Sequence, residues 1–231
     1  MIYVVSDLYG DWEKYKAVLK EINLKDEDTL FVLGNIVDGG DKGIEILMDM
    51  MLHGNIFPIL GDHDLVAYEV LSGIEKETRK DFSAPLSKLL AERCRMWTER
   101  GGEGTLFGFS KLSDDDKITL LEYMEEFSLY EEVEAGGFEF VLVRNMPEDF
   151  KLNDSLENYS AEDILSGGID YNREYFPDKI LVSANDVTIT IDRETHGKIF
   201  KNDYHVAINC GSSMGGDVAI YCLDTDEEFY V

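Results

Sequence analysis

Three short loops contain the side chains that could do chemistry. They read SDLYGD at residues 6–11, GNIVDGG at residues 34–40 and GDHD at residues 61–64. Each loop combines glycine, whose backbone tolerates tight turns and close approach, with carboxylate, amide or imidazole groups. Carboxylate oxygens and imidazole nitrogens are common ligands of divalent metals in proteins. The loops therefore indicate a metal site or a phosphate site, provided that the fold brings them together.

The segments between these loops alternate in a way that would bring them together. Apolar runs that begin at Ile2, Thr29 and Asn55 predict strands, and WEKYKAVLKEI and GIEILMDMML between them have helical spacing. Strand, helix and strand in this order predict a parallel sheet, in which ligands bind beyond the carboxyl ends of the strands. We therefore expect a single crevice lined by the residues that follow the strand ends, namely Asp7, Asn35, Asp38, Asp62, His63 and Asp64.

The rest of the chain changes character. Residues 66–134 are expected to be mostly helical, because SAPLSKLLAERCRMWTER and SDDDKITLLEYMEEFS read as helices. From Phe138 onwards, short runs such as FEFVLV, VTITID and DVAIYCL predict strands, and GSSMGG predicts a hairpin turn. No internal repeat or low-complexity linker interrupts the sequence, so residues 1–231 are predicted to form one domain.

The amino-acid composition limits the kinds of partner that the chain is expected to bind. The chain has 231 residues, of which 44% are hydrophobic, so it can bury a sizeable core and is not expected to be disordered. Its formal net charge of −27 repels the phosphates of nucleic acids and of anionic membranes, and neither is expected as a partner. Such charge usually solvates a surface, although a basic protein would also be attracted to it.

The cysteines and the first residues bear on the compartment. Cys94, Cys210 and Cys222 are odd in number and widely spaced, which is typical of a reduced protein rather than of a disulfide framework. The segment MIYVVSD has no basic region followed by a long apolar region, and no apolar run approaches the roughly 18 residues of a membrane span. We expect a cytoplasmic protein.

Taken together, the three loops resemble the calcineurin-like metallophosphoesterases, and within them the bacterial and phage branch of Ser/Thr protein phosphatases. That family has the motifs DxHG, GDxxDRG and GNH(D/E) in this order, followed by a VHAG-like motif and a GHT motif. The resemblance extends to the closing strands of the chain. It implies a four-layer α/β/β/α sandwich with a helical insertion, and a pair of divalent metals of the Mn, Fe or Mg type.

The metal-ligand positions that the resemblance implies are mostly substituted. Asp7 retains the first aspartate of the family, whereas the other positions carry different side chains, namely Tyr9, Asn35, Asp62, Arg144 and Ala184. Asn35 would offer a metal only a neutral oxygen, and Arg144 is a fixed cation that would repel one. Only Asp7 and Asp62 remain good ligands, with Asn35 a weak third. We expect no metal, or a weakly bound one, and we expect Arg144 to form an ion pair with Asp7 or Asp62.

Of the other residues that the resemblance implies for catalysis and phosphate binding, some are retained and one is lost. His63 and Asp38 correspond to the histidine that protonates the leaving group and to the aspartate that orients it. Without metals, these two residues could equally be a hydrogen-bonded pair that stiffens two loops. The phosphate-gripping arginine of the family has become Gly39. Arg100 lies where relatives have an NGG-type stretch near the mouth of the site, and it could contact a substrate.

Three functions are compatible with this pattern. The first is a pseudophosphatase that acts by binding, with a phosphorylated or basic protein as its partner. The second is an active phosphoesterase with an altered, mononuclear site built on Asp7, Asn35, Asp62 and His63. The third is a structural or oligomer-forming protein in which the crevice has no role. The sequence contains no signal that fixes the partner or the oligomeric state.

Overall fold

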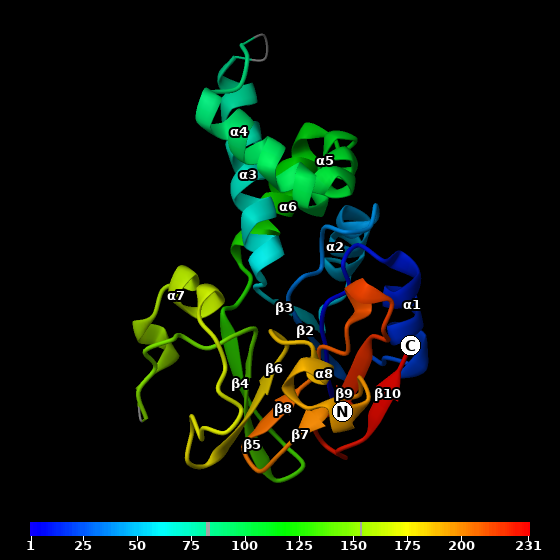
Figure 1. Ribbon diagram of the computed structural model, residues 1–231. Helices are drawn as coiled ribbons and strands as arrows, with labels where there is room; N and C mark the ends of the chain where they lie inside the picture. The colour runs from blue at the N-terminus through cyan, green and yellow to red at the C-terminus, as the bar shows by residue number, and fades with distance from the viewer. Residues whose placement is uncertain (82–83, 153) are drawn as a thin grey trace.

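The structure is a computed structural model that describes residues 1–81, 84–152 and 154–231 (Figure 1). Within these ranges the strands form two five-stranded sheets. The first sheet has the order β10 (Glu228–Tyr230), β9 (Ala219–Cys222), β1 (Ile2–Val5), β2 (Thr29–Leu33) and β3 (Ile56–Ile59). The second has the order β4 (Tyr130–Ala135), β5 (Phe138–Val143), β6 (Lys179–Ser183), β8 (His205–Ala207) and β7 (Phe200–Lys201).

The N-terminal third forms the predicted parallel strand–helix–strand units. β1 pairs in parallel with β2, and β2 pairs in parallel with β3, with α1 (Trp12–Glu21) and α2 (Gly43–Met50) in the connections. α1 begins where the Asp11 carboxylate accepts hydrogen bonds from the backbone N–H groups of Glu13 and Lys14. Tyr15 and Val18 bury one face of this helix against the sheet. The two connections place the loops after β1, β2 and β3 at the same edge.

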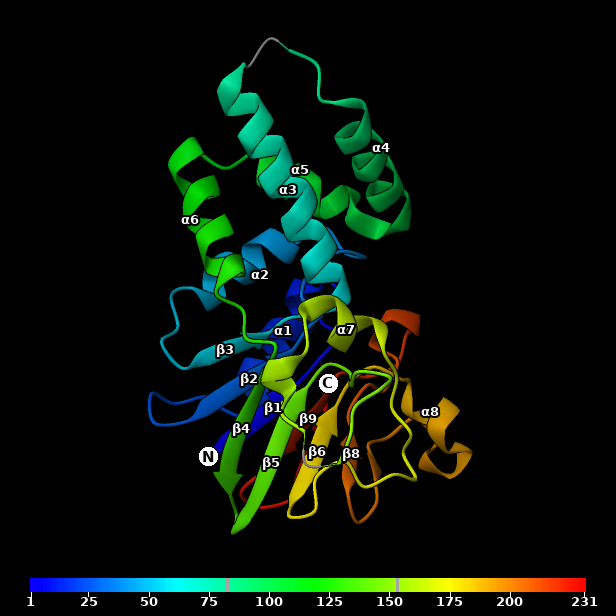
Figure 2. The ribbon, with the colours of Figure 1, turned by 90° about the vertical axis from the view of Figure 1, so that its left-hand side faces the viewer.

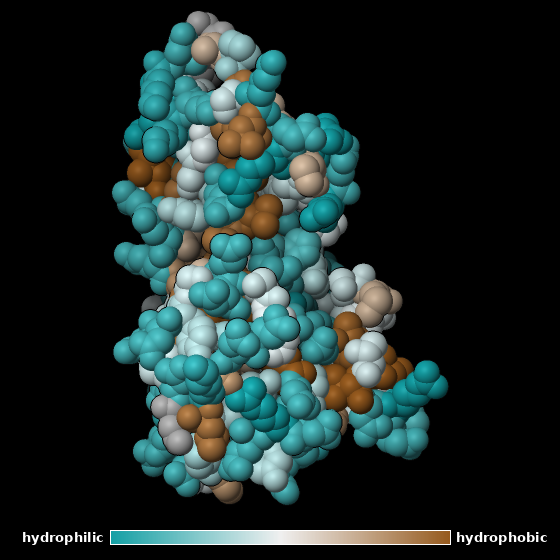
Figure 3. Space-filling view, turned by 60° about the vertical axis from the view of Figure 1, so that its left-hand side comes forward, coloured by the Kyte–Doolittle hydropathy of each residue, from teal (hydrophilic) through white to brown (hydrophobic). Residues whose placement is uncertain are grey.

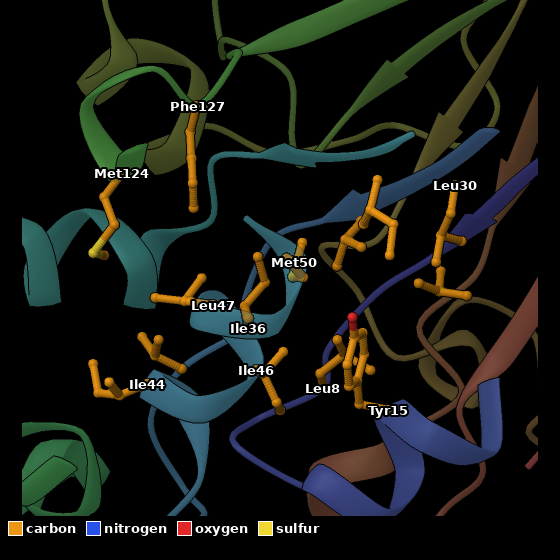
Figure 4. Close-up of a cluster of buried hydrophobic side chains, with 14 of the residues drawn as sticks. Leu8, Tyr15, Leu30, Ile36, Ile44, Ile46, Leu47, Met50, Met124 and Phe127 are labelled. Carbon is orange, nitrogen blue, oxygen red and sulfur yellow. The ribbon is translucent and has the colours of Figure 1, made fainter. Parts of the chain in front are cut away.

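Three groups of buried apolar side chains define four layers. Figure 4 shows the group on the outer face of the first sheet, where residues of α1 and α2 pack. A second group lies between the sheets and includes Phe31 and Leu33 from one sheet and Phe140 and Leu142 from the other. On the outer face of the second sheet, the third group includes Ile164 of α7 (Ala161–Ser166). The predicted α/β/β/α sandwich is therefore confirmed.

A helical section follows β3 and rises from the edge of the sheets that carries the loops (Figure 2). It contains α3 (Asp62–Lys80), α4 (Lys88–Trp97), the π-helical turn η1 (Thr98–Gly102), α5 (Glu103–Ser110) and α6 (Asp114–Glu125). The predicted limits of 66–134 are wrong at both ends, because α3 begins within the GDHD loop and β4 occupies residues 130–135. β4 is an edge strand rich in glutamate, so its sequence YEEVEA lacks the apolar run that marks the other strands.

Two short segments also differ from prediction. VTITID forms the single turn α8 (Thr188–Ile191), because its backbone bonds locally and Thr188 N–H donates to the carbonyl of Asn209. Tertiary contact here overrides the strand propensity of β-branched residues. GSSMGG is not a hairpin turn, since it joins β8 of the second sheet to β9 of the first through the 3₁₀ turn η4 (Ser212–Met214). The remaining 3₁₀ turns are η2 (Leu156–Asn158) and η3 (Arg193–Thr195).

The face shown in Figure 3 is mostly hydrophilic, with separate apolar groups on the helical section and on the sandwich. Among the described helices, none is both long and apolar enough to cross a membrane. The three cysteines are free, with Cys210 and Cys222 buried.

Candidate functional site

The loops after β2 and β3 touch each other through two glycines. A Cβ atom on Gly34 would lie 2.5 Å from the Cα of Gly61, so only glycine fits this contact. The loop after β1 joins them, because Asp7 N–H donates to the carbonyl of Gly34 at 3.1 Å. The three loops that carry the predicted site residues therefore lie side by side, as the strand order requires.

Asp64 holds two of these loops together. Its carboxylate accepts hydrogen bonds from four backbone N–H groups, on Asn35, Ile36, Val37 and Gly61, at 2.7–3.2 Å. Burial raises the pKa of Asp64 to about 6, while three of these N–H groups favour the ionised form and limit the shift. The side chain is completely buried, so its role is to fix the loop that follows β2.

Four site residues adopt left-handed backbone conformations. The φ angles are 57° at Asp7, 45° at Tyr9, 56° at Asn35 and 68° at Asp38. Aspartate and asparagine tolerate this region better than most residues, whereas a bulky tyrosine rarely does. Such conformations persist only where surrounding contacts impose them, and they cluster at functional sites. The loops therefore adopt left-handed backbone conformations that most residues avoid, although several of their side chains are unsuited to binding metals.

Arg144 is buried against the ends of β1 and β2. It follows β5 directly, and its Nη1 lies 2.9 Å from Asp7 Oδ2 and 3.3 Å from the carbonyl oxygen of Leu33. Its Nε lies 3.7 Å from Asp62 Oδ1. The expected ion pair with Asp7 is therefore present. Burial acts to lower the pKa of Arg144, but the adjacent carboxylates of Asp7 and Asp62 outweigh it and raise the pKa, so the guanidinium stays charged.

The other substituted positions also fail to offer metal ligands. The amide nitrogen of Asn35 donates to Asp7 Oδ1 at 3.3 Å and to the hydroxyl of Tyr9 at 3.1 Å. The amide oxygen of Asn35 accepts a hydrogen bond from the backbone N–H of His63. Burial raises the pKa of Tyr9 to about 12, so its phenol is neutral. Ala184 is buried and has no polar side-chain atom.

This donor set does not fit the metal pair that the family resemblance implies. A cation already lies against Asp7, and the amide nitrogen of Asn35 faces Asp7 from the other side. Within the described ranges, no group of three or more histidine, cysteine, aspartate or glutamate side chains is arranged to hold a metal ion. Asp62 is half exposed at the rim, where its one ion pair within the described residues is with Arg144.

His63 and Asp38 form a hydrogen-bonded pair in which His63 Nδ1 lies 2.9 Å from Asp38 Oδ2. This bond raises the pKa of His63 above its ordinary value, against the opposing effect of burial. Two residues of the helical section hold the buried Asp38 carboxylate. Trp97 Nε1 donates to Oδ2 and Thr105 Oγ1 donates to Oδ1, each at 2.9 Å. The hydrogen-bonded pair expected of these two residues is therefore present.

Gly39 stands where the family resemblance implies a phosphate-gripping arginine, and it packs against the helical section. Its N–H donates to the carbonyl of Gly101 at 3.0 Å. Gly101 has a φ of 109°, which favours glycine, and it lies within η1 next to Arg100. Arg100 lines the mouth of the crevice beside His63, where it was expected.

The structure adds four residues that the sequence did not single out for these roles. They are Asp64, Trp97, Thr105 and Ser212, whose hydroxyl donates to the carbonyl of Asp7. Only Asp64 had a local signal, because an acid three residues after a glycine at a helix start is typical of a capping arrangement. The other three reach the loops from sequence-distant segments.

Comparison with known proteins identifies the class. The sequence profile of the calcineurin-like phosphoesterases matches residues 1–207. The chain therefore belongs to this family, whose members normally depend on divalent metals.

Two of the curated relatives are named bis(5'-nucleosyl)-tetraphosphatase, symmetrical. The protein of Hamiltonella defensa is 31% identical over 91 residues, which cover 38% of this chain and 32% of that protein. The protein of Vibrio vulnificus is 35% identical over 86 residues, which cover 36% of this chain and 32% of that protein. The chain thus matches about a third of the length of these relatives.

Solved structures support the fold alone, because their sequence identities are low. A structure described as a candidate diadenosine tetraphosphatase has a TM-score of 0.64 at 12% identity, covering 100% of this chain and 92% of the other. A metallophosphoesterase from Sphaerobacter thermophilus has a TM-score of 0.56 at 14% identity, covering 100% and 87%.

Proposed function

We propose that this chain is a pseudophosphatase, which binds a phosphorylated ligand in its crevice without metal-dependent hydrolysis. The observation that carries the proposal is the buried ion pair between Arg144 Nη1 and Asp7 Oδ2, at 2.9 Å. A guanidinium does not lose its proton in proteins, so it cannot make way for a dication by becoming neutral. Arg144 supplies the carboxylates of Asp7 and Asp62 with the positive charge that metals would otherwise provide.

Two features support binding as the remaining activity. The loops after β1 and β2 hold left-handed backbone conformations at Asp7, Asn35 and Asp38, and such conformations cluster at functional sites. The formal net charge of −27 also favours a basic segment on a protein partner, so a phosphorylated or basic protein suits this crevice and surface.

A second candidate is an active phosphoesterase with an altered site built on Asp7, Asn35, Asp62 and His63. The intact hydrogen bond between His63 Nδ1 and Asp38 favours it, because an oriented imidazole can protonate a leaving group. By analogy with the curated relatives, its substrate would be a dinucleoside polyphosphate. This candidate requires a metal ion or another means of activating water beside Arg144.

Metal analysis and a hydrolysis assay distinguish the two candidates. The purified protein is analysed for bound metal and then assayed on a generic phosphomonoester with Mn²⁺. The pseudophosphatase predicts substoichiometric metal and no turnover above background. Stoichiometric metal, together with turnover that is lost in His63→Ala, would establish the second candidate instead.

A restored variant provides the positive control. If the substitutions are what abolished hydrolysis, activity should appear only when they are reversed together. The restored variant combines Tyr9→His, Asn35→Asp, Asp62→Asn, Arg144→His and Ala184→His. A fully folded restored variant that binds two metals and still fails to hydrolyse the ester would show that the loss of ligands was not the cause.

A further inference from the structure

Arg100 is a cation that has no partner among the residues that the structure describes. Its side chain is exposed on η1, and within the described ranges it takes part in no hydrogen bond or ion pair. Neighbouring arginines on α4 differ, since Arg95 pairs with Glu92 and Glu99, and Arg93 pairs with Glu69. In a chain with 48 acidic and 21 basic residues, an unpaired arginine beside a crevice is unusual.

The backbone beneath Arg100 is fixed. η1 is kinked at Gly101, whose φ of 109° lies outside the helical region. The carbonyl of Gly101 accepts the hydrogen bond from Gly39 N–H, at 3.0 Å, which ties this turn to the loop after β2. Arg100 is thereby held next to Gly39, the position from which the family's phosphate-gripping arginine is missing.

Arg100 and His63 are shared by the walls of two cavities. The first has a volume of ≈ 270 Å³ and lies against α3 and α4. The second has a volume of ≈ 540 Å³ and lies between the loops after β1 and β2 and the turn η4. A ligand with two chemically different parts could therefore place one part in each cavity, with Arg100 beside the point where the two parts join.

The first cavity is suited to an apolar group. Val66, Val70, Met96 and Trp97 form its apolar wall. Its volume exceeds the roughly 150 Å³ of an apolar protein cavity that admits benzene. A methionine sulfur also makes favourable contacts with aromatic rings. An aryl group matches this wall better than a charged or strongly hydrated group.

The two acids that line the first cavity, Asp38 and Asp62, do not prevent an aryl group from binding there. Asp38 is buried and satisfied by Trp97, Thr105 and His63. Asp62 lies at the rim within 3.7 Å of Arg144 Nε, so part of its charge is compensated.

The second cavity is suited to an anion. Its cations are Lys14 and Arg100, and its one acid, Asp11, is engaged in capping α1. Lys14 Nζ donates to the carbonyls of Ser212 and Gly216, which leaves one of its three donors for a ligand. Arg100 retains all five of its donors, in a planar arrangement that matches phosphate oxygens.

We propose that the two cavities form one binding site for a small aryl phosphate, in which Arg100 and Lys14 bind the phosphate group and the apolar wall receives the ring. This inference rests on the proposed function, because it gives the chemical class of the ligand that the crevice binds. Arg100 makes the phosphate contact from the helical section rather than from the loop after β2. No metal is needed for this contact.

The test is an equilibrium titration of the whole chain, in a metal-chelating buffer of low ionic strength, with phenyl phosphate, glycerol 2-phosphate and inorganic phosphate. Phenyl phosphate should bind most tightly. Arg100→Gln should weaken all three ligands by about tenfold, as expected for loss of a charge-assisted contact. Met96→Ser should weaken phenyl phosphate by about threefold and leave inorganic phosphate unchanged.

Arg95→Gln is the matched control, because it removes the same charge from an exposed position that lines neither cavity. It should leave all three affinities unchanged. Equal effects of Arg100→Gln and Arg95→Gln would overturn the site while leaving the pseudophosphatase intact. If none of the three phosphates binds the wild-type chain, the site is refuted and phosphate binding fails with it. If the chain hydrolyses phenyl phosphate with Mn²⁺, the pseudophosphatase fails, and a raised KM in Arg100→Gln alone would still support the site.

Discussion

Replacing Arg144 with an uncharged residue should lower the stability of the chain, because the buried Asp7 carboxylate then loses its positively charged partner. The Arg144 side chain is 5% exposed and that of Asp7 is 2% exposed, so both partners of the ion pair are out of contact with solvent. In Arg144→Met, the one side-chain hydrogen-bond donor that the described residues leave to the Asp7 carboxylate is the amide of Asn35, at 3.3 Å. Loss of one partner from a buried ion pair costs about 3–5 kcal/mol of stability, because a charge is left buried and uncompensated.

The assay is chemical denaturation at pH 7, from which the free energy of unfolding is obtained. The double variant Arg144→Met/Asp7→Asn removes both charges and should regain a large part of the loss, because neutral partners of similar size avoid the buried charge. Arg95→Met is the control, since its ion pairs with Glu92 and Glu99 are exposed and should contribute little to stability.

The same variant tests whether Arg144 stands in place of a metal. Once the guanidinium is gone, Mn²⁺ should raise the thermal midpoint of Arg144→Met more than that of the wild-type chain, because a ligand that binds the folded state stabilises it. The reasoning is refuted if Arg144→Met unfolds with nearly the wild-type free energy. It is also refuted if the double variant is no more stable than the single one.

Three further predictions concern the loops around the site. Asp64→Ala should destabilise the chain by about 3 kcal/mol or more, because four backbone N–H groups lose their acceptor, and Asp64→Asn should cost less in the same denaturation experiment. Because the hydrogen bond to Asp38 raises the folded-state pKa of His63 above 6.5, its contribution to stability should be full below pH 6.5 and lost as the pH rises through the raised value. His63→Gln should remove this pH dependence, and an unchanged profile would contradict it. Gly34→Ala should destabilise the chain by more than about 2 kcal/mol in the same experiment, because its Cβ would lie 2.5 Å from the Cα of Gly61 at a positive φ; near-wild-type stability would exclude the close contact.

The fold and the position of the crevice could be predicted because their signals are local. Each of the first three strands is a short apolar run, and the helices between them have clear spacing, so the convergence of Asp7, Asn35 and His63 follows from the rules of parallel sheets. The pairing of Arg144 with Asp7 could also be predicted, because the order of the family motifs placed a cation among carboxylates.

The support for Asp38 could not be predicted in the same way. Trp97 and Thr105 are separated from Asp38 by 59 and 67 residues, and they reach it only because the helical section docks over the crevice. Nothing in the sequence around either residue distinguishes a donor to a buried carboxylate from an ordinary core position. The strand predicted for VTITID failed for a related reason, since a contact with distant Asn209 decides its conformation.

The electrostatics of the crevice also indicate which substitution matters most for metal binding. Unit charges 4 Å apart interact by about 4 kcal/mol near a protein surface, so a dication at that distance from a guanidinium is opposed by roughly 8 kcal/mol. A metal on Asp7 would meet this repulsion, because Asp7 Oδ2 lies 2.9 Å from Arg144 Nη1. Asn35→Asp adds a single negative charge, whose attraction for a dication at a similar distance is about as large as this repulsion, so a restored carboxylate would only cancel the effect of the guanidinium. A site restored at every position except Arg144 should therefore bind metal more weakly than a site in which Arg144 is replaced as well, and metal analysis of the two variants tests this expectation.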